Sequence, residues 1–276
     1  MLRFLLTILF SATVVAQNNP LKSDENRKLF ADYLYCQQDY LRAAEEYETL
    51  SKMNLSDTIF YKIGKSYSII GNTDKALNYF SFIKSNSSLL KYALLEEARI
   101  FYLTDDSNSL NKIVNDFDRS SFELKKIQIA FYLKTNLLDS VHNDLFKIDD
   151  NDINTLKSFY ERRKNPAYKS ETLAGILSAI IPGLGKIYTE NYGDGITAFI
   201  LTGIFSYLAY DNFKHSHQFR AYLFSGLTAG FYLGNVYGSV ASAQIFNAKV
   251  DFDFLNDLTE FLSRKNYFIN ELEFCK

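Results

Sequence analysis

Apolar residues in the first half of the chain recur every three or four positions, which is the period of one face of an α-helix. Phe60, Ile63 and Tyr67 would share one helical face, and a second run with the same period begins at Ala76. Gly71, followed by an asparagine, stands between the two runs, and this pair is typical of a turn. The pattern therefore predicts a helix, a tight turn and a second helix.

Small residues recur at the same place in successive units of this pattern. Ala31, Gly64, Ala98 and Ala130 are separated by 33, 34 and 32 residues. A small side chain is needed where two antiparallel helices approach closely, because a larger one would wedge them apart. A nearly constant period of this length indicates helix pairs that stack into a solenoid.

The aromatic, Ile-Gly, Tyr, Ala and Phe spacing of residues 60–83 resembles the tetratricopeptide repeat family, and the resemblance extends over about residues 22–150. One unit matches well, a second matches moderately through Ala43 and Tyr47, and two are degenerate. The resemblance implies a curved solenoid whose concave face, lined by first-helix residues, binds extended or helical peptides. An ordinary helical bundle that contains helix pairs is the alternative.

The resemblance also implies which side chains would line the concave face. Carried over to this sequence, those positions are Asp32, Tyr35, Tyr61, Lys65, Ser68, Arg99, Tyr102, Phe131 and Lys134. The candidate partner-binding residues among them are Tyr35, Tyr61, Lys65, Arg99, Tyr102 and Lys134. Tyrosine and arginine are common binding anchors, and the cations would suit an acidic segment or a C-terminal carboxylate. Packing or solvated roles, with the repeats acting as a rigid spacer, are the alternative.

The second half of the chain contains two long runs without charged residues. Residues 195–210 and 221–248 are uncharged, and the polar segment 211–220 separates them. Apolar runs divided by about ten polar residues predict a helical hairpin in a membrane. The first run is marginal in length for one span, so a glycine-rich hairpin buried in a soluble domain is the alternative.

Glycines recur every four residues in the second run and resemble a glycine zipper. They are Gly226, Gly230, Gly234 and Gly238. This spacing aligns them along one stripe of a helix, where another helix backbone can come close in lipid. Ala198, Thr202 and Ser206 of the first run offer a matching stripe, and Asn235 would need a polar partner on a neighbouring helix.

The segment before the hairpin is interrupted by Pro182, Gly183 and Gly185. These residues break a helix, so residues 172–188 are expected to form a re-entrant or interfacial segment. The segment resembles small bacterial two-helix membrane domains that open with a Pro-Gly-x-Gly-x-x-Tyr turn, a resemblance that covers about residues 172–248. Phosphate binding by the glycines is not supported, because no strand precedes them and no Gly-Lys-Ser/Thr sequence follows.

The first sixteen residues predict a secretory signal peptide. Arg3 is followed by an apolar run that is too short to span a bilayer, and Ala16 precedes the expected cleavage site. Export would place Cys36 and Cys275 in an oxidising compartment. They lie far apart in the sequence, and nothing in it brings them together, so we expect both cysteines to be unpaired.

Composition and charge exclude several classes of function. The chain has 30 Lys+Arg and 32 Asp+Glu residues, and this net charge of −2 gives no support for nucleic-acid binding. The three histidines form no convincing catalytic or metal-binding pattern; His215 and His217 fit a polar hinge better than a metal site. We therefore expect no catalytic residues, no metal and no cofactor, and give an enzymatic function little weight.

The sequence as a whole predicts an all-α protein with four parts. These are a signal peptide (1–16), tetratricopeptide-like helical repeats (17–165), a membrane-associated hairpin with a re-entrant segment (166–248) and an amphipathic C-terminal helix (249–276). The expected function is a non-enzymatic scaffold or adaptor, anchored in the bacterial envelope with its repeats on the periplasmic side. It would bind a protein or peptide. The alternative is an oligomeric membrane pore or transport component assembled through the glycine stripe.

Topology signals conflict at the membrane entry. Arg162, Arg163, Lys164 and Lys169 would flank it on the outer side if the repeats are exported, against the usual excess of positive charge on the cytoplasmic side. Long exported domains translocate largely regardless of charge, so the signal peptide is given more weight.

Overall fold

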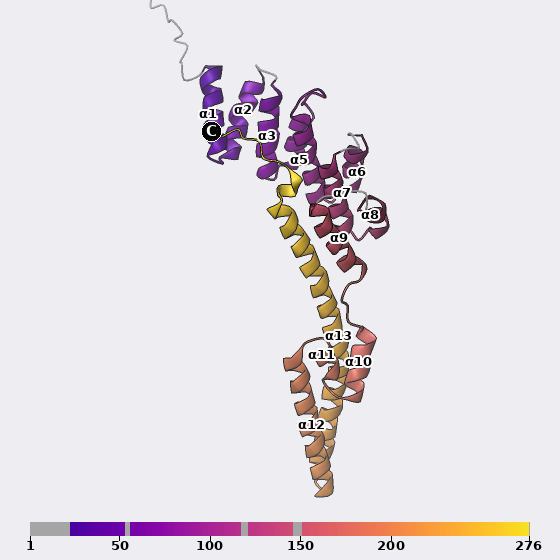
Figure 1. Ribbon diagram of the computed structural model, residues 1–276. Coiled ribbons are helices and arrows are strands. Elements are labelled where there is room, and N and C mark those ends of the chain that lie inside the picture. Colours follow the sequence, from indigo (N-terminus) through magenta and orange to yellow (C-terminus); the bar gives the residue numbers. More distant parts are fainter. Residues whose placement is uncertain (1–22, 53–55, 117–120, 146–150, 276) are drawn as a thin grey trace, which may run out of the picture. The chain divides into compact units, whose positions relative to one another are not determined.

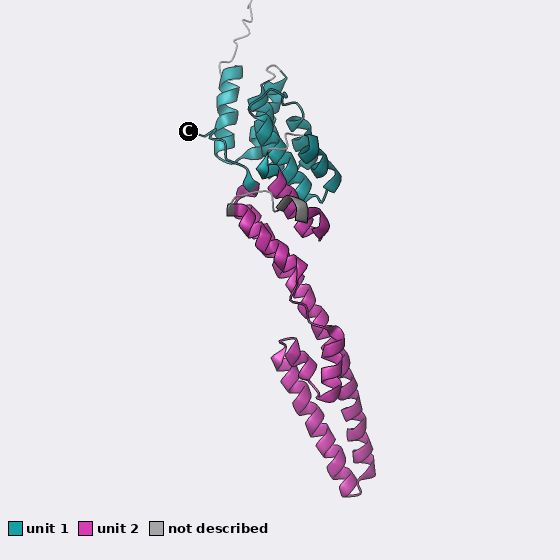
Figure 2. Cartoon of the chain, turned by 45° about the vertical axis from the view of Figure 1, so that its right-hand side comes forward, with its two compact units in different colours: residues 1–124, 268–276 teal, residues 125–267 magenta. Residues whose placement is uncertain are grey.

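Every regular element of the described chain is a helix. The computed structural model describes residues 23–52, 56–116, 121–145 and 151–275, and no strand occurs within these ranges (Figure 1). This confirms the all-α fold class. The predicted signal peptide lies outside the described residues. The chain divides into two compact units, which comprise residues 1–124 with 268–276 and residues 125–267 (Figure 2).

The first unit consists of consecutive helix pairs. Its helices are α1 (Asp24–Cys36), α2 (Tyr40–Ser51), α3 (Asp57–Ile69), α4 (Thr73–Phe80), α5 (Leu90–Leu103) and α6 (Ser107–Asp116). Each odd-numbered helix packs against the next one, and α2 also packs against α3. Ser23, Asp39 and Asn72 cap α1, α2 and α4 by accepting backbone N–H bonds three residues ahead, so the starts of these helices are encoded locally.

The recurring small position lies where the helices meet. Ala31, Gly64 and Ala98 are all buried. A β-carbon on Gly64 would lie 2.6 Å from the ring of Phe80 on α4. The bulky aromatic of the second helix therefore requires a residue without a side chain on the first helix.

The second unit combines the last three helices of the predicted repeat region (17–165) with the hairpin. Its elements are most of α7 (Phe122–Lys134), then α8 (Leu138–Leu145), α9 (Asn151–Lys164), α10 (Glu171–Ile180), α11 (Leu184–Tyr188), α12 (Tyr192–Lys214), α13 (Gln218–Arg264) and the start of a 3₁₀ turn (Asn266–Phe268). Helices α12 and α13 are the two arms of the hairpin, and α10 and α11 also pack on α13.

Helix α13 is continuous for 47 residues. It begins at the hinge, passes the expected boundary at residue 248 without a break, and ends at Arg264, within the segment 249–276 that was predicted as an amphipathic helix. Phe254, Leu258 and Leu262 are buried in that last part, where Phe254 and Phe261 contact Phe159 of α9. The hairpin and the amphipathic helix are therefore one structural element. Residues 269–275 after it are not helical.

The Pro-Gly-Leu-Gly turn between α10 and α11 is a closely packed junction. Gly183 has a φ of +89°, and a β-carbon there would lie 2.0 Å from the backbone oxygen of Gly195. A β-carbon on Gly185 would lie 1.9 Å from the backbone oxygen of Ala174. The Gly185 N–H donates to the hydroxyl of Ser178 over 2.9 Å. The motif is therefore explained by backbone packing.

Two buried hydroxyl pairs attach this junction to α13. The hydroxyl oxygens of Ser178 and Ser239 are 2.6 Å apart, and those of Thr189 and Ser242 are also 2.6 Å apart. Buried polar groups are tolerated when they are hydrogen-bonded to one another. Short polar side chains thus allow α10 and α11 to lie close to α13. Within the described ranges, no helix combines the length and the hydropathy needed for a membrane span.

The junction leads to a first prediction. Gly185→Ala should destabilise the packing of α10 and α11 by about 1–3 kcal/mol, because the new methyl group collides with backbone that cannot move aside easily. Hydrogen exchange of the full-length protein should be at least about tenfold faster for amides in residues 171–189. Gly193→Ala is the matched control, since no atom lies within 4 Å of its β-carbon position. Equal exchange in both variants would contradict this account.

Candidate functional site

A buried lysine on α3, Lys62, connects the first helices of the first unit. The Lys62 side chain of α3 donates to Oδ1 of Asp32 on α1 over 2.5 Å, and the Tyr47 hydroxyl of α2 donates to the same oxygen. Lys62 is only 5% exposed. Burial alone would raise the pKa of Asp32, but the hydrogen bonds from Lys62 and Tyr47 outweigh it and lower the pKa. The pair is therefore charged and joins the first three helices.

Three aromatic rings surround the same ammonium group. The Lys62 nitrogen lies 5.4 Å from the ring centroids of Tyr35 and of Tyr47, and 4.9 Å from that of Phe274. Cations are attracted to the faces of such rings at these distances. Phe274 belongs to the C-terminal segment, so a residue from the end of the chain completes a site formed by the first helices.

The C-terminal segment packs against two of the candidate binding residues. The ring of Phe274 lies 6.3 Å from that of Tyr35 and 5.8 Å from that of Tyr61. Leu272 also packs on the core formed by α1 to α5. The surface to which the resemblance assigns peptide binding is thus in contact with the chain's own tail.

A disulfide fixes this tail. Cys36 at the end of α1 is bonded to Cys275, with Cα atoms 5.6 Å apart. Figure 1 shows the C-terminal end of the chain beside α1. The expectation of two unpaired cysteines was wrong. The two residues are separated by 239 positions in the sequence, and only the return of the tail to the first unit brings them within bonding distance.

Two of the candidate cations, Lys65 on α3 and Arg99 on α5, form ion pairs inside the protein. Glu96 of α5 is fully buried and forms ion pairs with Lys65 and Arg99. Arg99 also donates to the Ser68 hydroxyl over 2.8 Å. A buried carboxylate must be neutralised in this way, because desolvation penalises its charge. In this structure Lys65 and Arg99 balance Glu96, a residue the sequence analysis did not single out.

The remaining candidates are less accessible or lie elsewhere. Tyr61 and Tyr102 are almost fully buried. Lys134 is half-buried in the last turn of α7, in the second unit. The structure therefore brings Tyr35 and Tyr61 together at the tail and Lys65 and Arg99 together at Glu96.

The phenols around the tail remain neutral. Burial, followed by the influence of nearby acidic groups, raises the pKa of Tyr35 and of Tyr61 above the usual value. Near neutral pH these rings offer apolar faces and hydroxyl groups, while Lys62 and Asp32 neutralise each other. The site can hold an apolar or aromatic segment by packing, ring contacts and hydrogen bonds.

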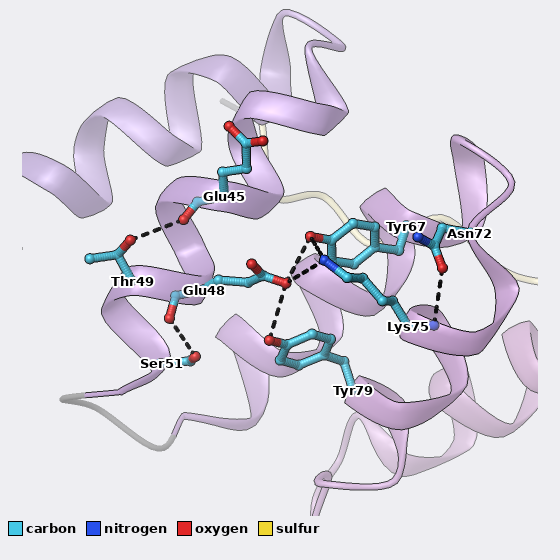
Figure 3. Close-up of polar contacts among 8 residues, drawn as sticks. All are labelled: Glu45, Glu48, Thr49, Ser51, Tyr67, Asn72, Lys75 and Tyr79. Atoms are coloured by element: carbon cyan, nitrogen blue, oxygen red, sulfur yellow. Dashed lines mark hydrogen bonds and ion pairs between the residues drawn. The ribbon is translucent and has the colours of Figure 1, made fainter.

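A second polar cluster connects α2 to the next helix pair. Oε1 of Glu48 accepts hydrogen bonds from the hydroxyls of Tyr67 and Tyr79 over 2.7 and 3.2 Å. The Lys75 ammonium lies next to Glu48 and the Tyr67 hydroxyl (Figure 3). The Lys75 ammonium donates to the Tyr67 hydroxyl over 2.9 Å and lies 4.4 Å from its ring centroid. The cluster draws side chains from α2, α3 and α4, so its evident role is to hold neighbouring helices in register.

Most of the glycine stripe on α13 faces open space. No atom lies within 4 Å of the β-carbon positions of Gly226, Gly230 and Gly234, whereas Gly238 faces the Lys186 side chain at 3.3 Å. The three open glycines line a groove of about 530 Å³ between α12 and α13. Ala198 of the expected matching stripe lines the same groove, whereas Ser206 lines a different one with Ser225 and Thr228.

A buried amide also lines this groove. Asn235 is 4% exposed, and neither its side-chain oxygen nor its nitrogen has a hydrogen-bond partner. A buried polar group in this state is unfavourable by about 1–3 kcal/mol. Binding of a ligand or helix that brings a hydrogen-bonding group into the groove would remove this penalty at Asn235.

The hairpin arms expose many large apolar side chains. They include Ile196, Phe199, Ile200, Ile204, Tyr207 and Tyr210 on α12, and Phe219, Tyr222, Leu233, Tyr237 and Ile245 on α13. Large exposed apolar patches on proteins are typical of sites that contact a membrane or another protein. At the hinge, the His215 ring lies against Asp211 of the preceding turn. Within the described residues, no group of three metal-ligating side chains is found.

Comparison with known proteins gives no match: no family model, no curated protein and no solved structure is significantly similar to this chain.

A half-buried carboxyl on α5 leads to a second prediction. Glu97 lies in a groove with Leu94, Phe101 and Lys112, and burial raises its pKa to about 7 from 4.5. Between these two pKa values the folded state holds a proton on Glu97 that the unfolded chain has released. The free energy of unfolding should therefore fall as pH rises from about 4.5 to 7. Glu97→Gln should be more stable than the wild type at pH 8, by roughly 1–3 kcal/mol, and similar to it at pH 4. Denaturant unfolding of the full-length protein at both pH values checks this, and a pH-independent difference would refute it.

Proposed function

We propose that the chain is a non-enzymatic, exported adaptor, attached to a bacterial envelope membrane by its hairpin, whose repeat half binds a protein or peptide. The observation that carries the proposal is the C-terminal segment packed against Tyr35 and Tyr61 through Phe274. A surface that holds one peptide segment through an aromatic side chain has the chemistry to hold another. Helix pairs with a recurring small position agree with a repeat scaffold.

The disulfide supports export. Disulfides persist in oxidising compartments and are rare in the cytosol, where thiols are kept reduced. The bond between Cys36 and Cys275 thus agrees with the signal-peptide pattern of residues 1–16. These are two independent features, because one depends on the first residues of the sequence and the other on the folded chain.

The exposed apolar side chains of the hairpin support membrane attachment. Leaving apolar surface in water is unfavourable by about 25 cal/mol per Å², and lipid would remove the exposed part of side chains such as Phe199 and Ile200 from water. Tyr207, Tyr210 and Tyr222 are exposed near the hinge, and tyrosine favours the boundary between lipid and water. Attachment rests on this surface rather than on the hydropathy of either arm as a whole.

A fractionation experiment tests the attachment. The wild-type protein should stay with membranes after extraction with alkaline carbonate. Ile200→Asp with Ile204→Asp should move most of the protein to the supernatant, because a charge in the hydrocarbon region costs about 2.5–3.5 kcal/mol. Leu29→Asp with Leu41→Asp is the control, since these exposed leucines belong to the first unit. If the wild type is washed off, or if both variants behave alike, membrane attachment by the hairpin is rejected.

The second candidate function is a membrane oligomer that forms a pore or transport component. It is favoured by the open glycine stripe and by the unpaired amide of Asn235 beside it. Glycines let helix backbones approach closely in lipid, where a facing helix could also bond the amide.

Crosslinking in membranes separates the two candidates. Gly230→Leu with Gly234→Leu fills the stripe without disturbing the hairpin, because both β-carbon positions are open. If the stripe joins copies of the chain, this variant should reduce the crosslinked oligomer about tenfold, equivalent to ~1.4 kcal/mol. Gly203→Leu, at an open position on α12, should leave it unchanged. A wild-type protein that gives no crosslinked species eliminates the oligomer.

A further inference from the structure

The C-terminal segment contacts the first unit with alternate side chains. Leu272 and Phe274 pack against the helix core, whereas Glu271 and Glu273 are exposed. The Phe274 N–H donates to the Leu272 carbonyl over 2.9 Å, so the two inward residues flank a tight γ-turn at Glu273. The segment is therefore held as a short turn of peptide, with apolar residues inward and acidic residues in solvent.

Phe274 is the anchor of this segment. Its ring contacts those of Tyr35 and Tyr61 and lies 4.9 Å from the buried Lys62 nitrogen. An aromatic side chain packed against other rings and a cation gains more than its buried area alone provides. Because Lys62 is already paired with Asp32, the surface selects the ring and not the charge of the segment.

The disulfide lies one residue beyond the anchor. Cys275 is exposed and Cys36 is partly exposed, so a reductant can reach the bond. While the bond is closed, it keeps Phe274 beside its site. A tethered segment competes at an effective concentration in the millimolar range or above. A free peptide of moderate affinity therefore cannot replace it.

We infer that the tail is a built-in ligand of the peptide-binding surface, and that opening the Cys36–Cys275 disulfide exchanges it for a partner segment of the same chemistry. The partner is a peptide with the apolar-x-aromatic pattern of Leu272 and Phe274. This inference rests on the proposed function, since it names the ligand class of the same surface.

The opening step is thiol–disulfide exchange with a dithiol. One thiolate of the dithiol attacks a sulfur of the bond and forms a mixed disulfide, which releases one cysteine as a thiolate that takes up a proton. The second thiol of the dithiol then displaces the other cysteine. The protein gains two thiols, and the dithiol becomes a disulfide.

Binding of the tail peptide tests the inference directly. The probe is a fluorescent peptide that copies residues 269–276 with Cys275→Ser, and the readout is its anisotropy on titration with full-length protein in detergent. The oxidised wild type should bind it at least tenfold more weakly than protein that has been reduced with dithiothreitol and alkylated. A second opened form is Phe274→Ala, which keeps the disulfide and removes only the anchor ring.

Matched peptides test the ligand chemistry without altering the protein. Phe274→Ala or Leu272→Ala in the peptide should weaken binding at least tenfold, whereas Glu273→Gln, on the exposed side, should leave it unchanged. Circular dichroism establishes that each opened form remains folded. If either folded form fails to bind the probe, or if the Phe274→Ala peptide binds as well as its parent, the inference is overturned.

The outcome is independent of the membrane experiment. Peptide binding reports on the first unit, whereas carbonate extraction reports on the hairpin. If the probe fails to bind while the protein stays in membranes, the tail is a structural seal and attachment still stands. If the probe binds while the protein washes off, the ligand class stands and the anchored adaptor is rejected.

Discussion

The buried ammonium of Lys62 is the constraint on which the first unit depends. An unpaired charge in this position would be unfavourable by several kcal/mol, so the surrounding elements must supply a carboxylate and polarisable rings. Helix α1 supplies Asp32, α2 supplies Tyr47, and the C-terminal segment supplies Phe274. One side chain thus requires contributions from two neighbouring helices and from the far end of the sequence, and the disulfide makes that arrangement permanent in an oxidising environment.

This arrangement changes how the repeat surface is understood. Residues that would bind a partner in a freely accessible groove already have internal roles: Tyr35 and Tyr61 contact the tail, and Lys65 and Arg99 neutralise Glu96. Under the proposed function, a partner would have to displace the tail or bind to another surface. The same contacts could then serve stability and recognition, because binding a peptide uses the apolar and aromatic groups that the tail covers.

Glycine has opposite roles in two parts of the hairpin. At the junction of α10 and α11, Gly183 and Gly185 leave no room for a methyl group, so they are required by the fold of the single chain. On α13, Gly230 and Gly234 face open space. Regular spacing in the sequence drew attention to the second pair, but spacing does not reveal whether a neighbour is present. The two uncharged runs predicted the hairpin, and the contacts of each glycine depended on packing.

Local patterns determined the helices of this protein, because the 3.6-residue period, the capping residues and the small positions act within a few turns of chain. The all-α class, the helix pairs and the two arms followed from them. Tertiary structure alone decided the bond between Cys36 and Cys275, the pairing of Lys65 and Arg99 with Glu96, and the continuity of α13 through residue 248. The disulfide and the Lys65–Glu96 ion pair join residues far apart in the chain, where one sequence carries no record of proximity, whereas Arg99 lies only one turn from Glu96 on α5. The continuity of α13 arises because α9 packs on its last part and covers the apolar face there. Composition alone divides this helix in two at residue 248.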